Sequence, residues 1–274
     1  MASPTTVARS VEFPDVSLYY EVRGDGPLIV LAGAPMSASD FAPLADLLAT
    51  DHTVLTVDPR GHRGSVLADP NRDSTPALRG EDLARLIDHL GIGPAVVLGS
   101  SGGAVSALAL LEAHPDLVTT VVAHEPPLVE LLDDRAELRA GTQDMIAAFR
   151  AGDVLGAFRK FFAQANISLP EPVLEQMFGG DRDPAQLASE HYWFNHELLG
   201  TVGWLPDLDT LRATPARVVI GIGVDSAGQL CDRSSRTLAA ALGLAPTMFP
   251  GDHIGFVGDP SAFAAYLRGV LRGD

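Results

Sequence analysis

The chain has 274 residues, of which 46% are hydrophobic and 20% charged, and its formal net charge is −16. This composition is that of a folded globular protein and excludes a disordered chain. So acidic a balance also argues against nucleic-acid binding and against attachment to an anionic membrane surface, because both depend on clustered cationic side chains.

Residues 1–16 mix Ser, Thr, Pro and charged side chains and contain no apolar core of a secretion signal. No run in the sequence reaches the roughly 18 apolar residues of a membrane span. We therefore expect a cytoplasmic protein with no membrane partner. A homodimer is one arrangement that the sequence leaves open.

Short apolar runs that are typical of strands alternate with helical patterns through the first half of the chain. The expected strands are residues 17–22, 28–32, 53–57, 95–98 and 118–123. The expected helices between them are residues 41–48, 78–90 and 105–111. Continuous runs such as residues 28–31 and 96–98 indicate strands that are buried on both faces, as in a parallel sheet.

The helix expected at residues 78–90 shows the clearest amphipathic pattern. Leu83, Leu86, Ile87 and Leu90 recur at helical spacing and form an apolar stripe, and we assign Asp82 to its polar border. Gly91 then supplies a stop signal. The segment predicts a helix that covers one face of the sheet.

From residue 126 to residue 213 the alternation stops, and the pattern becomes helical without strand signals. The expected helices are residues 128–139, 145–150, 154–165, 172–178 and 186–199. Strand patterns resume at residues 217–221 and 247–249. We therefore predict an α/β core domain of residues 1–125 and 214–274 and a helical cap (lid) of residues 126–213, which lies over the open end of the sheet where ligands of such folds bind.

The most informative stretch, residues 94–108, has the sequence PAVVLGSSGGAVSAL. It consists of an apolar strand, the motif G-x-S-x-G centred on Ser101, and the start of a helix. In this context the glycines permit a sharp turn that lifts the serine hydroxyl above the sheet, and the helix N-terminus favours developing negative charge. Ser101 is therefore the candidate nucleophile, with Ser100 as the neighbouring rival.

Several segments together resemble the α/β-hydrolase fold family over residues 11–271. They are LIVLAGA at residues 28–34, DPRGHRGS at residues 58–65, the Ser101 motif, and GDH at residues 251–253. The resemblance implies a mostly parallel central sheet flanked by helices, with an inserted cap. It also implies that the backbone amides of Ala34 and Gly102 form an oxyanion hole, although Ala32 stands where the family commonly has a histidine.

A serine hydroxyl needs a general base and a carboxylate that orients this base. His253 is the candidate base because it follows the last strand and comes after Ser101 in the chain. Two carboxylates remain as candidates for the acid. Asp225 suits the family's usual placement but falls one position short of it, whereas Glu125 ends a strand directly before the cap. We favour Asp225 slightly.

No metal or cofactor pattern accompanies these residues. With Cys231 as its one cysteine, the chain allows no internal disulfide and no cysteine-based zinc site. The G-x-G pairs at residues 91–93 and 221–223 do not continue into a dinucleotide-binding fingerprint, and no Walker A, EF-hand or H-E-x-x-H pattern occurs. We therefore expect no cofactor and no metal.

The sequence thus predicts a serine hydrolase that cleaves an ester, lactone or related acyl bond through an acyl-enzyme. A long cap that carries Phe178, Trp193, Phe194 and Trp204 favours a small, mainly apolar molecule as its partner. The alternative is a non-hydrolytic cyclase, isomerase or ligand-binding protein on the same fold, since fold does not determine function.

Overall fold

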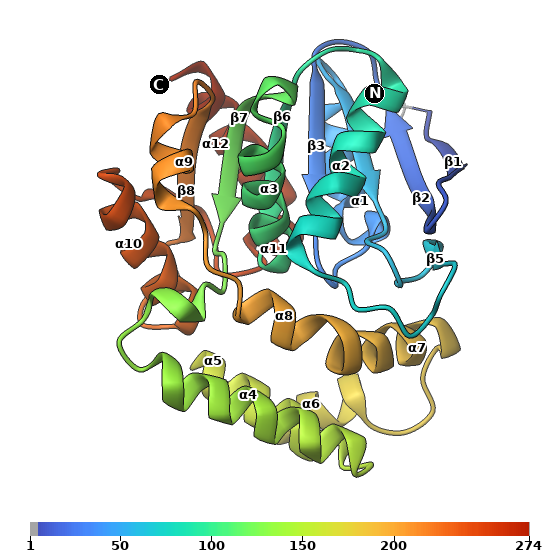
Figure 1. Ribbon diagram of the computed structural model, residues 1–274, viewed down its shortest axis with the longest axis vertical. Coiled ribbons are helices and arrows are strands. Elements are labelled where there is room, and N and C mark those ends of the chain that lie inside the picture. The colour runs from blue at the N-terminus through green and yellow to red at the C-terminus, as the bar shows by residue number, and fades with distance from the viewer. Residues whose placement is uncertain (1–4, 274) are drawn as a thin grey trace.

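The computed structural model describes residues 5–273. Residues 1–4 and 274, which are the outermost parts of the predicted core domain and include the start of the N-terminal segment 1–16, lie outside the described residues. A single nine-stranded sheet forms the centre of the molecule, in the order β1-β2-β4-β3-β6-β7-β8-β9, with β5 beside β2 (Figure 1).

The sheet is mostly parallel, as predicted. Its strands are β1 Val7–Glu12, β2 Val16–Arg23, β3 Leu28–Ala32, β4 Thr53–Val57, β5 Val66–Leu67, β6 Ala95–Ser100, β7 Val118–His124, β8 Arg217–Gly223 and β9 Thr247–Phe249. In the sheet order β4-β3-β6-β7-β8-β9, every neighbouring pair is parallel. Strand β2 pairs antiparallel with β1, β4 and β5. The strands β1 and β5 were not expected from the sequence.

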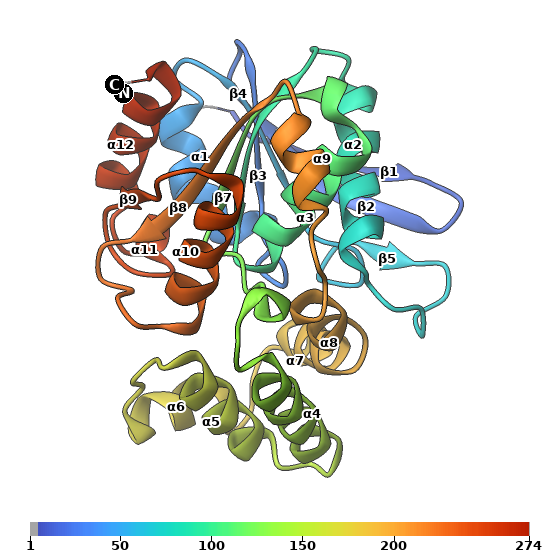
Figure 2. The same ribbon diagram turned by 60° about the vertical axis from the view of Figure 1, so that its left-hand side comes forward.

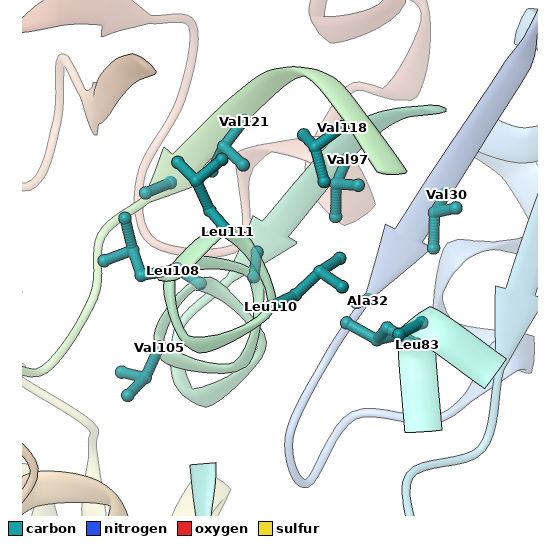
Figure 3. Packing of buried hydrophobic residues seen from close by; sticks show 14 of the residues in the cluster. Val30, Ala32, Leu83, Val97, Val105, Leu108, Leu110, Leu111, Val118 and Val121 are labelled. Atoms are coloured by element: carbon teal, nitrogen blue, oxygen red, sulfur yellow. The ribbon is translucent and has the colours of Figure 1, made fainter. Parts of the chain in front are cut away.

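Helices cover both faces of the sheet, and each face has its own hydrophobic core. On one face lie α2 Pro76–Leu90, α3 Gly102–Ala113, α9 Leu208–Ala213 and α10 Leu230–Leu242. On the other lie α1 Ala42–Leu48, α11 Gly255–Gly258 and α12 Pro260–Arg272. Leu108 and Leu111 of α3 belong to the same buried cluster as Val97, Val118 and Val121 of the sheet (Figure 3).

The start and end of α2 follow from its sequence. The Thr75 side chain accepts a hydrogen bond from the Leu78 amide, Pro76 begins the helix, and Gly91 ends it in a left-handed conformation. Asp82 is buried, however, and pairs with the buried Arg60 at 2.6 Å. The assignment of Asp82 to the polar border is therefore wrong, because an ion pair satisfies its charge inside the protein.

A group of helices lies beyond the carboxyl ends of the strands (Figures 1 and 2). It comprises α4 Arg135–Arg150, α5 Val154–Ala165, α6 Glu171–Phe178, α7 Pro184–Tyr192, a π-helical turn at Trp193–Glu197, and α8 Leu198–Val202. All of these elements except α7 contribute to a separate hydrophobic cluster that includes Met145, Phe158 and Trp193, whereas Tyr192 of α7 packs with the core. The segments 128–139 and 145–150 do not form the two expected helices, since α4 runs unbroken from Arg135 to Arg150.

The end of the predicted cap segment belongs structurally to the core. Leu211 of α9 is buried in the same cluster as α3 and α10, so α9 packs on the sheet side and apart from α4 to α8 (Figure 2). We use the term cap below for α4 to α8. Within residues 5–273, no helix is both long enough and apolar enough to cross a lipid bilayer.

Candidate active site

Ser101 lies at the sharp turn between β6 and α3. Its backbone has φ 55° and ψ −125°, a conformation that side-chain-bearing residues rarely adopt and that costs about 1–3 kcal/mol. The Ser101 amide donates a hydrogen bond of 2.9 Å to the carbonyl of His124, which ties the turn to β7. The surrounding sheet thus holds Ser101 in a strained, partly exposed position on the wall of a cavity.

Close backbone contacts explain the glycines around this turn. A Cβ atom on Gly99 would lie 2.3 Å from the Gly103 carbonyl oxygen, and one on Gly103 would lie 2.1 Å from the Ala32 carbonyl oxygen. Both distances are far below van der Waals contact. Only glycine lets the start of α3 approach β3 and β6 this closely, and this approach raises Ser101 above the sheet edge.

The two residues predicted to supply oxyanion amides lie together. Ala34 and Gly102 are both buried, and a Cβ atom on Gly102 would lie 2.4 Å from the Ala34 carbonyl oxygen. Both residues line the same cavity as Ser101. The amide of Gly102 also belongs to the first turn of α3, where helix N–H groups have no intrahelical partner. Their role as oxyanion donors stays a prediction.

His253 pairs with Glu125. The distance between His253 Nδ1 and Glu125 Oε2 is 2.5 Å, and the Glu125 side chain is completely buried. The other carboxylate oxygen, Oε1, accepts a hydrogen bond of 2.8 Å from the Gly223 amide. Burial alone would raise the pKa of Glu125, but the hydrogen bond and the charge of His253 outweigh burial and lower this pKa below its ordinary value.

Asp225 does not reach His253. It is exposed, and its backbone amide donates to the carbonyl of Gly251, two residues before His253. The slight preference for Asp225 over Glu125 is therefore corrected, because the structure brings the alternative acid to the imidazole. Spacing along the chain misled here, since β7 and β8 are neighbours and their carboxyl ends both face the His253 turn.

Ser100, the rival serine, points to a different histidine. It is buried, and its Oγ atom lies 3.3 Å from Nδ1 of His124, which is also fully buried. Burial lowers the pKa of His124 to about 4, so its imidazole is neutral near pH 7. Ser100 and His124 form a buried pair within the sheet, away from the cavity wall.

A cavity of about 410 Å³ lies between the sheet edge and the cap. Ser101 and His253 line it from the core, and the cap contributes apolar side chains that include Met145, Phe161, Trp193 and Leu198. Cys231 also lines it, and burial raises the pKa of the Cys231 thiol, which keeps this group neutral. A volume of this size accommodates a small organic molecule.

The sequence pattern that defines the alpha/beta hydrolase family matches residues 28–266. The chain belongs to the alpha/beta hydrolase family. The fold expected from the sequence, a mostly parallel sheet flanked by helices, is confirmed by this match and by the solved structures that superpose on the chain.

Named relatives of this alpha/beta hydrolase are hydrolases. It is 28% identical over 270 residues to "Uncharacterized hydrolase YraK" of Bacillus subtilis (strain 168), which covers 96% of this chain and 95% of that protein. It is 25% identical over 259 residues to "Zearalenone hydrolase" of Bionectria ochroleuca, with 92% of each chain covered. The family and these relatives support a hydrolytic enzyme.

One similar solved structure is described as "Est816 as an N-Acyl homoserine lactone degrading enzyme". It matches with a TM-score of 0.72 and 21% identity, and covers 95% of this chain and 99% of its own. At this identity the match shows a shared fold.

Of the aromatic residues that predicted an apolar ligand, only Trp193 lines the cavity of this alpha/beta hydrolase. Phe194 stacks on Phe149 within the cap, Phe178 stacks on Phe158, and Trp204 packs against the core. The sequence did not single out the other apolar residues of the cavity wall, because helical periodicity cannot distinguish a side chain that lines a cavity from one that fills a core. Among residues 5–273, no group of three or more His, Cys, Asp or Glu side chains is arranged to hold a metal ion.

Proposed function

We propose that this protein is a serine hydrolase that cleaves an ester, lactone or related acyl bond of a small, mainly apolar molecule. The observation that carries the proposal is the pairing of His253 with the buried Glu125 on the wall of the cavity that Ser101 also lines. A carboxylate on Nδ1 fixes the imidazole tautomer in which Nε2 is free to accept a proton. His253 is then equipped to act as a general base toward Ser101.

The reaction proceeds in two acyl transfers. His253 Nε2 takes the proton of the Ser101 hydroxyl while Oγ bonds to the substrate carbonyl carbon, and the carbonyl oxygen gains the negative charge. The amides of Ala34 and Gly102 donate to this oxyanion. The carbon–oxygen bond to the leaving alcohol then breaks, and His253 returns its proton to that alcohol. Water, deprotonated in turn by His253, then bonds to the acyl carbon. The bond from this carbon to Ser101 Oγ breaks, Oγ takes the proton back from His253, and the carboxylic acid leaves.

The character of the cavity supports the substrate class. Its wall is mainly apolar, with Met145, Phe161 and Trp193 from the cap, so an apolar acyl group gains free energy by leaving water there. The described activity of Est816 toward N-acyl homoserine lactones is consistent with lactone cleavage on this fold. A mainly apolar ester or lactone therefore fits the site best.

Covalent labelling tests the proposal. A fluorophosphonate probe phosphonylates an activated serine, so we expect labelling of the wild-type protein and of Ser100→Ala, and none of Ser101→Ala. Ser100→Ala is a matched control because it removes the adjacent hydroxyl, which faces His124. Hydrolysis of p-nitrophenyl esters of graded acyl length should depend on Ser101 in the same way. A folded wild-type protein without Ser101-dependent labelling would instead indicate a non-hydrolytic or ligand-binding role.

A further inference from the structure

Arg79 of α2 is buried between the core and the cap, with only 3% of its surface exposed. Its guanidinium group donates four hydrogen bonds, to the Ser106 hydroxyl, the Ser74 carbonyl, the Ser74 hydroxyl and the Thr201 hydroxyl, at distances from 2.8 to 3.0 Å. It also lies 3.6 Å from the carboxylate of the buried Glu197. Arg79 is therefore held by partners from several different segments.

On the core side, the hydrogen-bond partners of Arg79 connect it to the turn that carries Ser101. Ser106 lies one helical turn into α3, and its hydroxyl accepts from Arg79 Nε at 2.8 Å and donates to the Gly102 carbonyl at 2.9 Å. Gly102 is the first residue of α3 and directly follows Ser101. Two hydrogen bonds thus connect the guanidinium group of Arg79 to the first turn of the helix that carries the proposed oxyanion donor.

On the cap side, the hydrogen-bond partners of Arg79 connect it to the wall of the cavity. Thr201 of α8 lines the cavity and accepts from Arg79 Nη2 at 2.9 Å. Glu197, at the end of the π-helical turn before α8, accepts from the Ser74 hydroxyl and contacts His62 Nε2, both at 3.1 Å. All these side chains are buried, so water does not compete for their hydrogen bonds.

We propose that Arg79 is a positioning residue that holds the Thr201 side of the cavity at a fixed separation from Ser101 and Gly102. The guanidinium group suits this role because its donors form a rigid planar fork, which fixes the directions of Ser106 and Thr201 relative to each other. A substrate lies between these two walls, so a shift of about 1 Å in the cap would move its carbonyl carbon away from Ser101 Oγ, with a large loss of rate. This inference rests on the proposed function.

Double-mutant cycles test whether Arg79 transmits the effect. Ser106→Ala removes the core end of the connection, and Thr201→Val removes the cap end with little change in shape. Each change is expected to lower kcat/KM for a p-nitrophenyl ester roughly tenfold. The double variant should also lose about tenfold, because either substitution alone already uncouples the cap from the core and the second one adds no further loss. Independent effects would instead multiply to roughly 100-fold.

Thr142 supplies the matched control for Thr201. It is a buried cap threonine that lines the same cavity, but its hydroxyl bonds to the Leu138 carbonyl and to Gln164 and makes no contact with Arg79. Ser106→Ala and Thr142→Val should therefore combine multiplicatively. Multiplicative loss for the Thr201 pair as well would overturn the inference.

Arg60 supplies the control for a merely structural role. It is also a fully buried arginine, but its ionic partners are Asp82 and Asp15 of the core. We expect Arg79→Lys to lower kcat at least tenfold per labelled active site with a smaller change in KM, and Arg60→Lys to lower stability while kcat per labelled site is kept. Equal kcat in the two variants would contradict the inference.

The fluorophosphonate probe separates this inference from the proposed function. If Ser101 is labelled and the Ser106–Thr201 cycle is multiplicative, the positioning role of Arg79 fails while the serine hydrolase stands. If Ser101 is not labelled in folded protein, both fail. Should Arg79→Lys not fold, the cycle decides alone, because Ser106→Ala and Thr201→Val are far milder changes.

Discussion

Glu125 occupies a backbone conformation that few residues tolerate. Its φ of 52° lies in the left-handed region, and its amide donates to the Gly221 carbonyl of the neighbouring strand β8. This geometry turns the side chain at the end of β7 toward the His253 turn, where the carboxylate bonds to both His253 and the Gly223 amide. The backbone strain is thus used to aim one buried carboxylate.

Substitution of the two candidate acids should affect kcat very differently. We expect Glu125→Gln to lower kcat roughly 10²–10⁴-fold, because an amide cannot hold the charged imidazolium or fix the tautomer of His253 as a carboxylate does. Asp225→Asn is the control, since Asp225 is exposed and does not contact His253, and it should change kcat by less than about twofold. Steady-state hydrolysis of a p-nitrophenyl ester measures both. A larger loss in Asp225→Asn than in Glu125→Gln would contradict the assignment of the acid.

The strand-turn-helix element β6–α3 is built around close backbone contacts. The first turn of α3 packs on the end of β3, where Gly103 faces the Ala32 carbonyl. All eight residues from Ala104 to Leu111 are buried. The element is therefore a rigid part of the core and holds the strained Ser101 turn from both sides.

A methyl group added at Gly103 should break this contact. Because the new Cβ atom would lie 2.1 Å from the Ala32 carbonyl oxygen, α3 must move away from β3. We expect Gly103→Ala to lower the free energy of unfolding by about 1–3 kcal/mol and to reduce fluorophosphonate labelling of Ser101. Gly258→Ala is the control, because no atom lies within 4 Å of its added Cβ position. Equal chemical denaturation curves for the two variants would contradict the prediction, because they would show that the close contact at Gly103 does not affect stability.

At the scale of the whole molecule, the cap meets the core through a buried polar cluster as well as through apolar contacts. Glu197 lies at the centre of this cluster, with His62, Ser74 and Arg79 around its carboxylate. Burial alone would raise the pKa of Glu197, but the charges of His62 and Arg79 outweigh burial and lower it below its ordinary value. The pKa shift links the docking of the cap to pH.

This shift has a definite sign. Because the pKa of Glu197 is lower in the folded than in the unfolded protein, its stabilisation is complete above the unfolded value of about 4.3 and is lost as the pH falls through the folded value. We expect Glu197→Gln to lower the free energy of unfolding by about 1–3 kcal/mol at pH 7, with a difference from wild type that shrinks below about pH 4. Urea denaturation at several pH values measures this difference.

The control for pH is Glu171→Gln. Glu171 forms an exposed ion pair with Arg159 within the cap, so its loss should change stability little at any pH. Buried carboxyls with raised pKa, such as Asp58 and Asp82, affect wild type and variants alike and cancel in the comparison. A constant difference between wild type and Glu197→Gln from pH 7 to pH 3 would contradict the assignment.

Much of the fold followed from local patterns, and the exceptions have physical causes. The parallel strands were recognised because they are buried on both faces and therefore continuously apolar. The edge strand β1 was missed because nearly all its residues are exposed, so backbone pairing with β2 alone defines it. Arg79 and Asp82 stand at apolar positions of the α2 pattern, and two opposite charges there were the available signal for buried ionic contacts.

The α/β-hydrolase fold and the sharp turn at Ser101 could be predicted from the sequence alone, because short motifs of neighbouring residues indicate both. The same motifs named His253 as the candidate base, which stays a prediction. Packing of the whole chain placed Glu125 rather than Asp225 beside His253. It brought Trp193, but not Phe178, Phe194 or Trp204, to the cavity wall, and it set Arg79 between Ser106 and Thr201. These outcomes depend on which strand ends and helix faces meet in space. Local periodicity carries no information about these tertiary contacts, because residues that are far apart in the sequence come together only when the whole sheet and the cap pack.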